Sequence, residues 1–261
     1  EVSPINKDIK ENILKISKAL NEQGLRVVAV CQKNNIEDIE HFDVKDEKNM
    51  ILLGFIGFLD PPKESAKESI EKLNHAGIRV IVLTGDNAEV TRCVCSKVGI
   101  NSKNIVLGSK LDKLSDTAVL RLLKKTNIFA KLSPIQKARI VRILKEAGNI
   151  VGYMGDGIND SPSLTNSDVG VSVDTAVDIA KESADIILLE KDLNVLLDGV
   201  TEGRRTFVNL MKYIKLATSF NFGEVVSVII ASALLPFLPE TPIQLLVEGL
   251  LYDFGQMTLP F

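Results

Sequence analysis

Between residues 63 and 189 the chain alternates amphipathic segments with short apolar runs, and this alternation restricts the possible folds more than any other feature. Apolar residues at helical spacing predict helices, and unbroken apolar runs predict strands that are buried on both faces. The expected helices are 64–76, 88–98, 111–125, 135–147 and 176–183, and the expected strands are 78–83, 127–130, 150–153, 169–173 and 184–189. Strands separated by helices of this length predict a doubly wound parallel α/β sheet.

The residues before this region follow a different pattern. Residues 7–21 have apolar side chains at helical spacing, and Gly24 is a stop signal before the next apolar run. The segment 34–49 is polar and is expected to be a surface excursion. The chain should therefore begin with a helix at 7–21 and two strands at 25–31 and 50–59.

The run Ile150 to Tyr153 leads directly into Met154-Gly155-Asp156-Gly157-Ile158-Asn159-Asp160. A loop at the carboxyl end of a parallel strand is where open α/β sheets place ligand chemistry, and its glycines let the backbone approach a phosphate or a metal. Asp156 and Asp160 supply the hard oxygen ligands that Mg²⁺ prefers, and Asn159 adds an uncharged amide. The alternative is an ordinary turn of Gly, Asp and Asn after a core strand.

Two other strand ends carry groups that could act on the same phosphoryl group. Thr84 offers a hydroxyl, and the Gly85-Asp86 turn offers backbone N–H groups. Lys137 lies on a helix that starts just after the strand end at Ala130, where its ammonium could neutralise developing charge. Each feature alone could be a turn or a solvated lysine. Together they predict one pocket that contains Thr84, Lys137, Asp156 and Asp160.

Composition and charge restrict the partners. A net charge of −3 and a pI near 5.6 give no basic footprint for nucleic acid. The three cysteines, Cys31, Cys93 and Cys95, form no zinc-site pattern and are expected to be reduced core thiols in a cytosolic environment. The chain does not begin with Met and has no signal peptide, which suggests a piece of something longer.

The final part of the chain predicts a membrane segment. No Lys or Arg occurs after Lys215, whereas basic residues cluster just before it, as is typical of a cytoplasmic flank. The segment 222–238, with its helical lead-in, is long enough to cross a bilayer, and 243–259 is expected to be a second, shorter span. A buried hairpin in a soluble protein is the alternative. We therefore expect a multi-pass membrane protein, placed in the cell membrane, with its α/β domain in the cytoplasm.

Several stretches resemble the motifs of P-type cation-transporting ATPases, which are haloacid-dehalogenase-like phosphotransferases. The loop and the residues after it, Ser161-Pro162-Ser163-Leu164, resemble the family pattern GDGxNDxPxL. Residues 60–63 resemble the DPPR hinge of the family, and residues 84–87 resemble its TGDN motif. Residues 129–137 resemble the FARxxPxxK motif, and residues 24–29 resemble the last strand of the nucleotide domain. The resemblance covers nearly the whole chain and implies that ATP and Mg²⁺ are cofactors.

The resemblance also implies roles for individual residues. Asp156 would bind Mg²⁺ with support from Asp160, and Lys137 would be the phosphate-site lysine, with Thr84 beside the phosphate. The implied nucleotide and phosphate contacts are Arg26, Thr84, Gly85, Asp86, Lys131, Lys137 and Asn159.

A domain division follows from the same resemblance. Residues 1–59 would be the end of a nucleotide-binding domain, 60–206 a phosphorylation domain with a haloacid-dehalogenase-like sheet, and 207–261 a stalk with two transmembrane helices. The nucleophile motif of the family, DKTGT, does not occur in the chain, and the actuator domain and earlier membrane helices are also missing. The chain therefore resembles a fragment that should form no phosphoenzyme alone, and its partners would be ATP, a divalent cation, the lipid membrane and the rest of a pump.

Acidic residues inside the expected spans suggest an ion path, because a carboxylate in lipid is costly unless it faces a polar cavity. The stretches 221–224 and 251–253 resemble parts of the fifth and sixth pump helices, which implies that Asn221, Glu224 and Asp253 are ligands of the transported cation. Met154 and the run 233–239 resemble the magnesium-transporting branch. The expected function is ATP-driven Mg²⁺ transport through an aspartyl phosphate. Glu224 favours a calcium-type pump as an alternative, and a non-catalytic truncated product or a soluble phosphatase also remains open.

Overall fold

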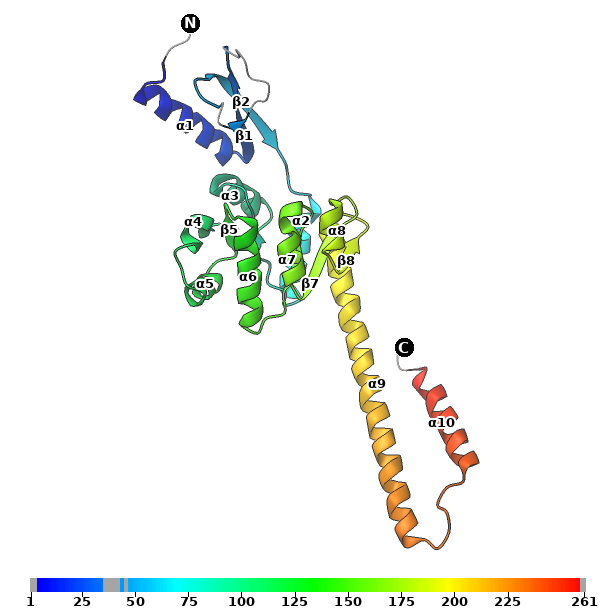
Figure 1. Cartoon of the computed structure of the whole chain (residues 1–261). Coiled ribbons are helices and arrows are strands. Elements are labelled where there is room, and N and C mark those ends of the chain that lie inside the picture. The colour runs from blue at the N-terminus through cyan, green and yellow to red at the C-terminus, as the bar shows by residue number, and fades with distance from the viewer. Residues whose placement is uncertain (1–3, 35–42, 45–46, 259–261) are drawn as a thin grey trace. The chain divides into compact units, whose positions relative to one another are not determined.

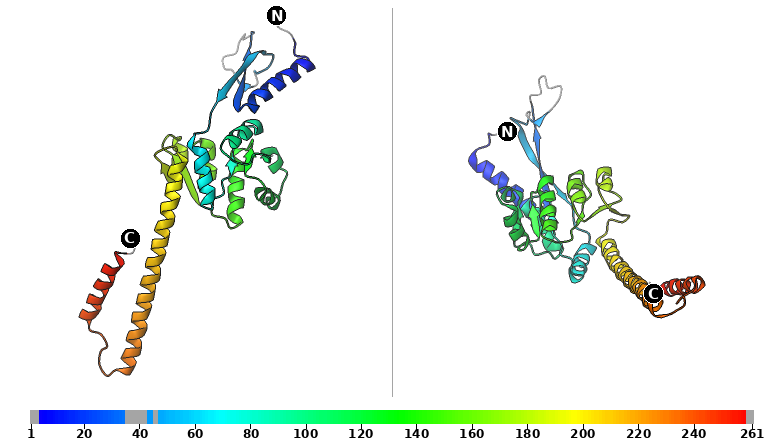
Figure 2. Two further views of the ribbon diagram at one scale, coloured as in Figure 1. Left: turned by 180° about the vertical axis from the view of Figure 1, so that it is seen from behind. Right: turned by 60° about the horizontal axis from the view of Figure 1, so that its bottom comes forward.

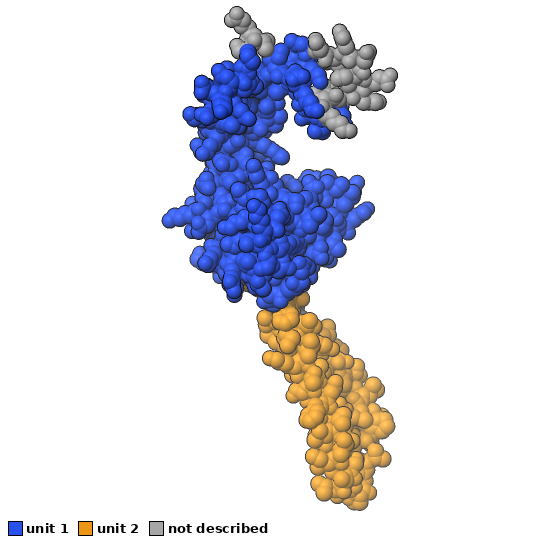
Figure 3. All heavy atoms as spheres, turned by 60° about the vertical axis from the view of Figure 1, so that its left-hand side comes forward, with its two compact units in different colours: residues 1–195 blue, residues 196–261 orange. Residues whose placement is uncertain are grey.

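The computed structural model describes residues 4–34, 43–44 and 47–258, and most of the polar segment expected at 34–49 lies outside these ranges. The chain divides into two compact units, residues 1–195 and residues 196–261 (Figure 3). The first unit contains all the strands and the predicted phosphate site, and the second contains apolar helix.

The first elements agree with the sequence prediction. Helix α1 (Lys7–Glu22) starts at Asn6, whose side-chain oxygen accepts a hydrogen bond from the Ile9 N–H at 2.8 Å. Gly24 follows the helix with a φ of +87°, a left-handed backbone conformation that glycine adopts without strain. Strands β1 (Leu25–Gln32) and β2 (Ile51–Leu59) then pair antiparallel, beside α1 in Figure 1.

The remaining strands form two parallel sheets (Figures 1 and 2). The first has the order β3-β5-β4 and consists of β3 (Val82–Leu83), β4 (Ile105–Leu107) and β5 (Ile128–Ala130). The second has the order β6-β7-β8 and consists of β6 (Gly152–Met154), β7 (Val169–Val173) and β8 (Ile186–Leu188). The predicted parallel α/β class is confirmed, and both β3 and β6 lie at the edge of their sheets.

Helices connect these strands and bury them. They are α2 (Ser65–His75), α3 (Ala88–Lys97), α4 (Gly108–Leu111), α5 (Asp116–Leu123), α6 (Pro134–Glu146), α7 (Ser161–Asn166) and α8 (Asp178–Glu182). Phe129 on β5 is fully buried, and apolar side chains of α5 and α6 such as Leu123 and Ile140 pack in the same cluster. Burial of side chains of this size contributes about 1.5–3 kcal/mol each, so this cluster holds the first sheet against its helices.

Several predicted elements differ from the structure in their bounds, and one strand was missed. The helix expected at 111–125 corresponds to α5 and starts five residues later, because Ser115 is the N-cap residue of α5 and lies in extended backbone, while Leu111 ends the separate helix α4. The strand expected at 78–83 pairs only over β3, since its partner β5 is itself three residues long. Strand β4 was not expected.

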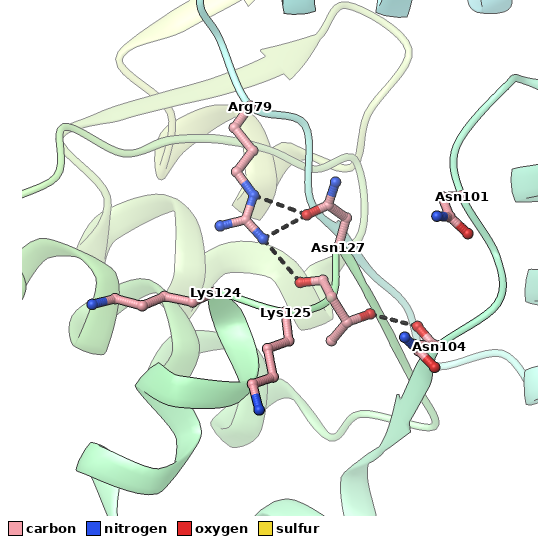
Figure 4. Close-up of a pocket in the computed structure, with 7 residues that line it drawn as sticks. Arg79, Asn101, Asn104, Lys124, Lys125 and Asn127 are labelled. Atoms are coloured by element: carbon pink, nitrogen blue, oxygen red, sulfur yellow. Dashed lines mark hydrogen bonds between the residues drawn. The ribbon is translucent and has the colours of Figure 1, made fainter.

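A network of hydrogen bonds around Arg79 lies at the end of the first sheet where its strands begin (Figure 4). The Arg79 guanidinium donates to Asn127 Oδ1 at 2.8 Å from Nε, and also to the carbonyls of Thr126 and Leu123 at the end of α5. Lys124 also lines this pocket, but in Figure 4 its ammonium points away from these bonds. Nε and one terminal nitrogen of Arg79 thus donate to the protein itself, so we interpret the pocket as structural.

The second unit contains most of α9 (Leu193–Leu234) and the whole of α10 (Pro242–Gln256). Within the described residues α9 is long and apolar enough to cross a membrane, by length and composition, whereas α10 has 15 residues. The two helices contact each other through Phe220 and Tyr252, whose rings stack with their centroids 4.0 Å apart. The predicted spans 222–238 and 243–259 thus correspond to the end of α9 and to α10, with Leu259 outside the described residues.

Candidate functional site

The centre of the site is an ion pair between α6 and the loop after β6. Lys137 Nζ lies 2.8 Å from Asp160 Oδ1, and the two side chains are only 13% and 14% exposed. Lys137 lies in the first turn of α6, and Asp160 ends the short 3₁₀ turn Ile158–Asp160. Two of the four residues predicted to share a pocket are therefore in direct contact.

The carboxylate of Asp160 has two further partners. Tyr153, the middle residue of β6, donates its hydroxyl to Oδ1 at 2.8 Å, and the Gly157 N–H donates to Oδ2 at 3.3 Å. Burial raises the pKa of Asp160, but the hydrogen bonds from Lys137 and Tyr153 outweigh burial, so this pKa lies below its ordinary value. Burial, followed by the bond to Asp160, raises the pKa of Tyr153. Asp160 is therefore a fixed carboxylate and Tyr153 a neutral donor.

Gly155 allows the loop to fold onto Asp160. A Cβ at position 155 would lie 2.5 Å from the Cβ of Asp160, closer than two carbons can approach. The Gly155 backbone is also held by β7, through its N–H to the Val171 carbonyl at 3.1 Å and its carbonyl to the Ser172 hydroxyl at 2.9 Å. The sequence suggested that this glycine admits a phosphate or a metal, but in the structure the close neighbour is Asp160 itself.

The start of α6 is fixed by a capping box, which determines where Lys137 lies. The Ser133 N–H donates to Gln136 Oε1 at 2.9 Å, and the Gln136 N–H donates to Ser133 Oγ at 3.3 Å. The same Gln136 side chain donates from Nε2 to the Gly108 carbonyl at 3.1 Å and to Asp112 Oδ1 at 2.6 Å. One side chain thus closes the helix end and joins α6 to α4.

Asp156 lies in the same loop but faces a different partner. Its Oδ2 is 2.6 Å from Lys191 Nζ, and both side chains are about half exposed, 52% for Asp156 and 56% for Lys191. Its carbonyl accepts a hydrogen bond from the Val177 N–H at 3.2 Å. Lys191 was not among the predicted site residues, because no motif contains it.

Thr84 and Asp86 form a second group at the end of β3. The Thr84 hydroxyl donates to Asp86 Oδ2 and accepts from the Asp86 N–H, both at 3.1 Å. The Lys131 N–H donates to the Asp86 carbonyl at 2.8 Å, with Lys131 in a left-handed conformation at a φ of 53°. Gly85 is exposed between them. Among the described residues, Thr84 has no direct hydrogen bond to Lys137 or to the Asp156–Asp160 loop.

Arg26 on β1 faces this second group. Its Nε lies 3.9 Å from Asp86 Oδ1, and its side chain is largely exposed. Asn87 caps α3 through its Oδ1 and donates from Nδ2 to Asn21 Oδ1 at 3.0 Å, so the end of α1 also contacts this turn. Asn159 is exposed in the loop of the first group.

The donor set suits one Mg²⁺ that is shared with a phosphate. No three His, Cys, Asp or Glu side chains gather into a metal cage within the described ranges. Mg²⁺ is commonly held by one or two carboxylates, with waters and substrate phosphate completing the octahedron. Asp156 presents an exposed carboxylate for this purpose, whereas both oxygens of Asp160 are already engaged.

The predicted cation ligands of the second unit lie on two helices. Glu224 of α9 is half-buried, whereas Asn221 of α9 and Asp253 of α10 are exposed within this unit. The contact between the helices is instead made by the ring stack of Phe220 and Tyr252.

Comparison with known proteins identifies the family of the first unit. The sequence profile of the haloacid dehalogenase-like hydrolases matches residues 4–168, which is more than half of the chain. The chain belongs to the haloacid dehalogenase-like hydrolases. The expected haloacid-dehalogenase-like fold of the chain is thus confirmed. The ion pair of Lys137 with Asp160 lies within the matched residues.

Relatives of this haloacid dehalogenase-like chain extend the match to its whole length. It is 50% identical over all of its 261 residues to the magnesium-transporting ATPase, P-type 1, of Escherichia coli K12, and covers 29% of that protein. It is 36% identical to calcium-transporting ATPase 1 of Bacillus cereus, over 96% of this chain and 28% of that protein. The predicted resemblance to P-type ATPases is therefore confirmed, and the chain spans less than a third of their length.

A solved structure has the same fold. The crystal structure of a zinc-transporting PIB-type ATPase in its E2.Pi state aligns with 96% of this chain and 32% of that chain, with a TM-score of 0.62 and 22% identity. At this identity the likeness supports the fold.

Proposed function

We propose that this chain is the phosphorylation domain and a membrane hairpin of an ATP-driven pump that moves Mg²⁺ through an aspartyl-phosphate intermediate. The observation that carries the proposal is the buried pair of Lys137 with Asp160, next to the exposed carboxylate of Asp156. Such a site places a positive charge and a metal-binding oxygen at the carboxyl end of a parallel strand, where phosphoryl transfer requires both. The similarity to a magnesium-transporting ATPase supports the choice of ion.

Each residue of the site then has a distinct role. The Lys137 ammonium neutralises charge on the transferring phosphoryl group, and Asp160 holds this ammonium in place. Asp156 holds Mg²⁺, which when bound shields the phosphate oxygens. Thr84 and the N–H groups of the exposed Gly85 turn orient the phosphate. Asp160 acts mainly by positioning, since its oxygens bind Lys137, Tyr153 and the loop.

The acceptor aspartate would come from the part of the pump that this chain does not span. Strands β3 and β6 are both edge strands, and each ends in one half of the proposed site. A parallel strand between them would join the two sheets and bring an aspartate at its carboxyl end to Thr84, Lys137 and Asp156. We therefore propose that this strand carries the nucleophile.

We propose that the nucleotide lies over the second group. Arg26, Asp86 and Lys131 surround the turn after β3 and would contact ATP, and the exposed amide of Asn159 would contact the phosphate. In this proposal residues 1–59 complete a nucleotide domain, 60–206 form the phosphorylation domain, and 207–261 form the stalk and two membrane helices of a multi-pass protein in the cell membrane.

For transport we propose that Asn221, Glu224 and Asp253 bind the cation together with the other membrane helices of the pump. Because two of these side chains are exposed on the α9–α10 pair, the ion site would be completed by neighbouring helices. Ca²⁺ is the second candidate ion, favoured by Glu224 and by the similarity to a calcium-transporting ATPase.

Two measurements test this proposal. A pump that contains this chain should incorporate phosphate from labelled ATP into a hydroxylamine-sensitive acyl phosphate, and Lys137→Met should reduce the rate of incorporation at least 100-fold. Lys145→Met removes the same charge from the later part of α6 and should leave the rate unchanged. The isolated chain should form no acyl phosphate, and its detection there would contradict the assignment of the nucleophile to another segment.

Transport is tested separately. Asp253→Asn should abolish ATP-driven transport of Mg²⁺ in vesicles that contain the pump while ATP binding stays normal, whereas Glu248→Gln should do much less because Glu248 lies on another side of α10. ATP-driven transport of Ca²⁺ instead of Mg²⁺ would favour the second candidate.

A further inference from the structure

Lys191 is bonded to the carboxylate that the proposed metal would bind. It lies in the four-residue connector between β8, which ends at Leu188, and α9, which begins at Leu193. Its ammonium is 2.6 Å from Oδ2 of Asp156, the exposed carboxylate that we propose as the metal ligand. The pair joins residues that are 35 positions apart in the sequence.

The connector is held in place by α2 and the residues before it. The Lys63 ammonium donates to the Lys191 carbonyl, and the Ser65 hydroxyl donates to Asp192 Oδ2 at 3.1 Å. The fully buried Ser69 hydroxyl donates to Asn194 Oδ1 at 2.9 Å. The backbone is therefore held at the Lys191 carbonyl and at the residues that follow it, and the Lys191 side chain extends to Asp156 from this anchored point.

An ammonium and a divalent cation compete for a carboxylate. The short hydrogen bond from Lys191 to Asp156 Oδ2 draws electron density away from the oxygens that would coordinate Mg²⁺, and the two positive charges repel each other. The ammonium on its flexible stem can swing into solvent, because the Lys191 side chain is 56% exposed.

We propose that Lys191 is a resident counter-ion of Asp156 that the divalent cation displaces when it binds, so that Lys191 lowers the affinity of the site for metal. This inference rests on the proposed metal site at Asp156. It assigns a function to a residue of the connector, whose backbone is bonded to the predicted hinge through Lys63.

The test measures metal binding directly. Free Mn²⁺, a spectroscopic substitute for Mg²⁺, is measured by electron paramagnetic resonance during titration of a pump that contains this chain, in detergent and with inorganic phosphate present, and Mg²⁺ is then added as a competitor. Lys191→Met should tighten binding about two- to fivefold, the range that corresponds to an exposed ion pair. Lys191→Arg keeps the charge and should stay within twofold of the wild type.

A matched control removes another lysine from a carboxylate. Lys145 Nζ lies 3.1 Å from Asp168 Oδ1, with both side chains about one-third exposed. Lys145→Met therefore frees a carboxylate outside the proposed metal site, and it should not change the affinity for Mn²⁺. Equal tightening by Lys145→Met and Lys191→Met would overturn the inference, because it would reflect net charge alone.

Two further variants separate this inference from the proposed function. Asp156→Asn should weaken Mn²⁺ binding, and Lys191→Met should then have no effect in the Asp156→Asn background. Unchanged affinity in Asp156→Asn would overturn the proposed metal site. Weaker binding in Asp156→Asn without tightening in Lys191→Met would overturn the role of Lys191 and leave the metal site standing.

Discussion

Tyr153 and Lys137 donate to the same atom, Asp160 Oδ1, each at 2.8 Å. One donor comes from the middle of β6 and the other from the first turn of α6, so a single carboxylate oxygen joins a strand to a helix. The Lys137 ammonium is neutralised and the Tyr153 hydroxyl is satisfied at the same point. Both the stability of this region and the position of Lys137 therefore depend on Asp160.

Removal of the Tyr153 hydroxyl tests this arrangement. Tyr153→Phe keeps the buried ring but removes one hydrogen bond to a charged acceptor, and we expect the free energy of unfolding to fall by about 1–2 kcal/mol. Denaturant titration of the whole chain in detergent measures this change. Tyr213→Phe, which removes a hydroxyl from an exposed side chain of α9, is the matched control. A loss in Tyr153→Phe no larger than in this control would contradict the prediction.

The lowered pKa of Asp160 predicts a pH dependence of stability. Because this pKa is lower in the folded than in the unfolded state, the stabilisation is fully present above about pH 4 and is lost as the pH falls through the folded-state value. Asp160→Asn cannot ionise and lacks this contribution. The difference in unfolding free energy between wild type and Asp160→Asn should therefore shrink from pH 6 to pH 3. A constant difference over this range would show that the charge of Asp160 does not stabilise the fold.

Because Gly155 lies so close to Asp160, we expect a Gly→Ala substitution to change stability very differently at position 155 and at an open position. Gly155→Ala should destabilise the protein by about 1–3 kcal/mol, because the new Cβ would overlap Asp160 and move it away from Lys137. Gly199→Ala, at an exposed position of α9 where a Cβ meets nothing within 4 Å, should instead stabilise by about 0.5–1 kcal/mol. Thermal unfolding of the two variants gives the comparison, and similar shifts of Tm would refute it.

The hydrogen-bond network in Figure 4 predicts a structural role for Arg79. Arg79→Met removes the donors that hold the end of α5 and should lower the free energy of unfolding by about 1–2 kcal/mol. The ammonium of Lys124 lines the same pocket but points away from this network. Lys124→Met should therefore change the free energy of unfolding by less than about 0.5 kcal/mol. Denaturant titration distinguishes the two. A larger effect of Lys124 would indicate that the charge of the pocket matters more than its hydrogen bonds.

The sequence predicted elements whose signals are local. Strand β7 was predicted residue for residue, because Val169–Val173 is a short apolar run between polar neighbours. Helix α6 was predicted because Ser133 and Pro134 are a strong start signal. Strand β4 was missed because three residues show no periodicity. Its place in the sheet depends on pairing with β5, which no local pattern contains.

The same distinction holds for the site. Motifs at strand ends predicted that Lys137 and Asp160 share a pocket but not that they pair directly, and the pairing of Lys191 with Asp156 depends on a connector held by α2. Tyr153 was seen only as the end of an apolar run. A buried tyrosine hydroxyl needs a partner, and this requirement could have pointed to a nearby carboxylate.

The capping box of α6 extends the constraints on this site beyond the residues that carry charge. Gln136 accepts a hydrogen bond from the Ser133 N–H and donates to the Gly108 carbonyl, and Lys137 follows it directly in the chain. A Cβ at position 108 would lie 2.3 Å from the Lys131 carbonyl oxygen, so that position must also remain glycine. Mutational drift at Ser133, Gln136 and Gly108 should therefore be as restricted as drift at the lysine itself, although none of the three carries a charge.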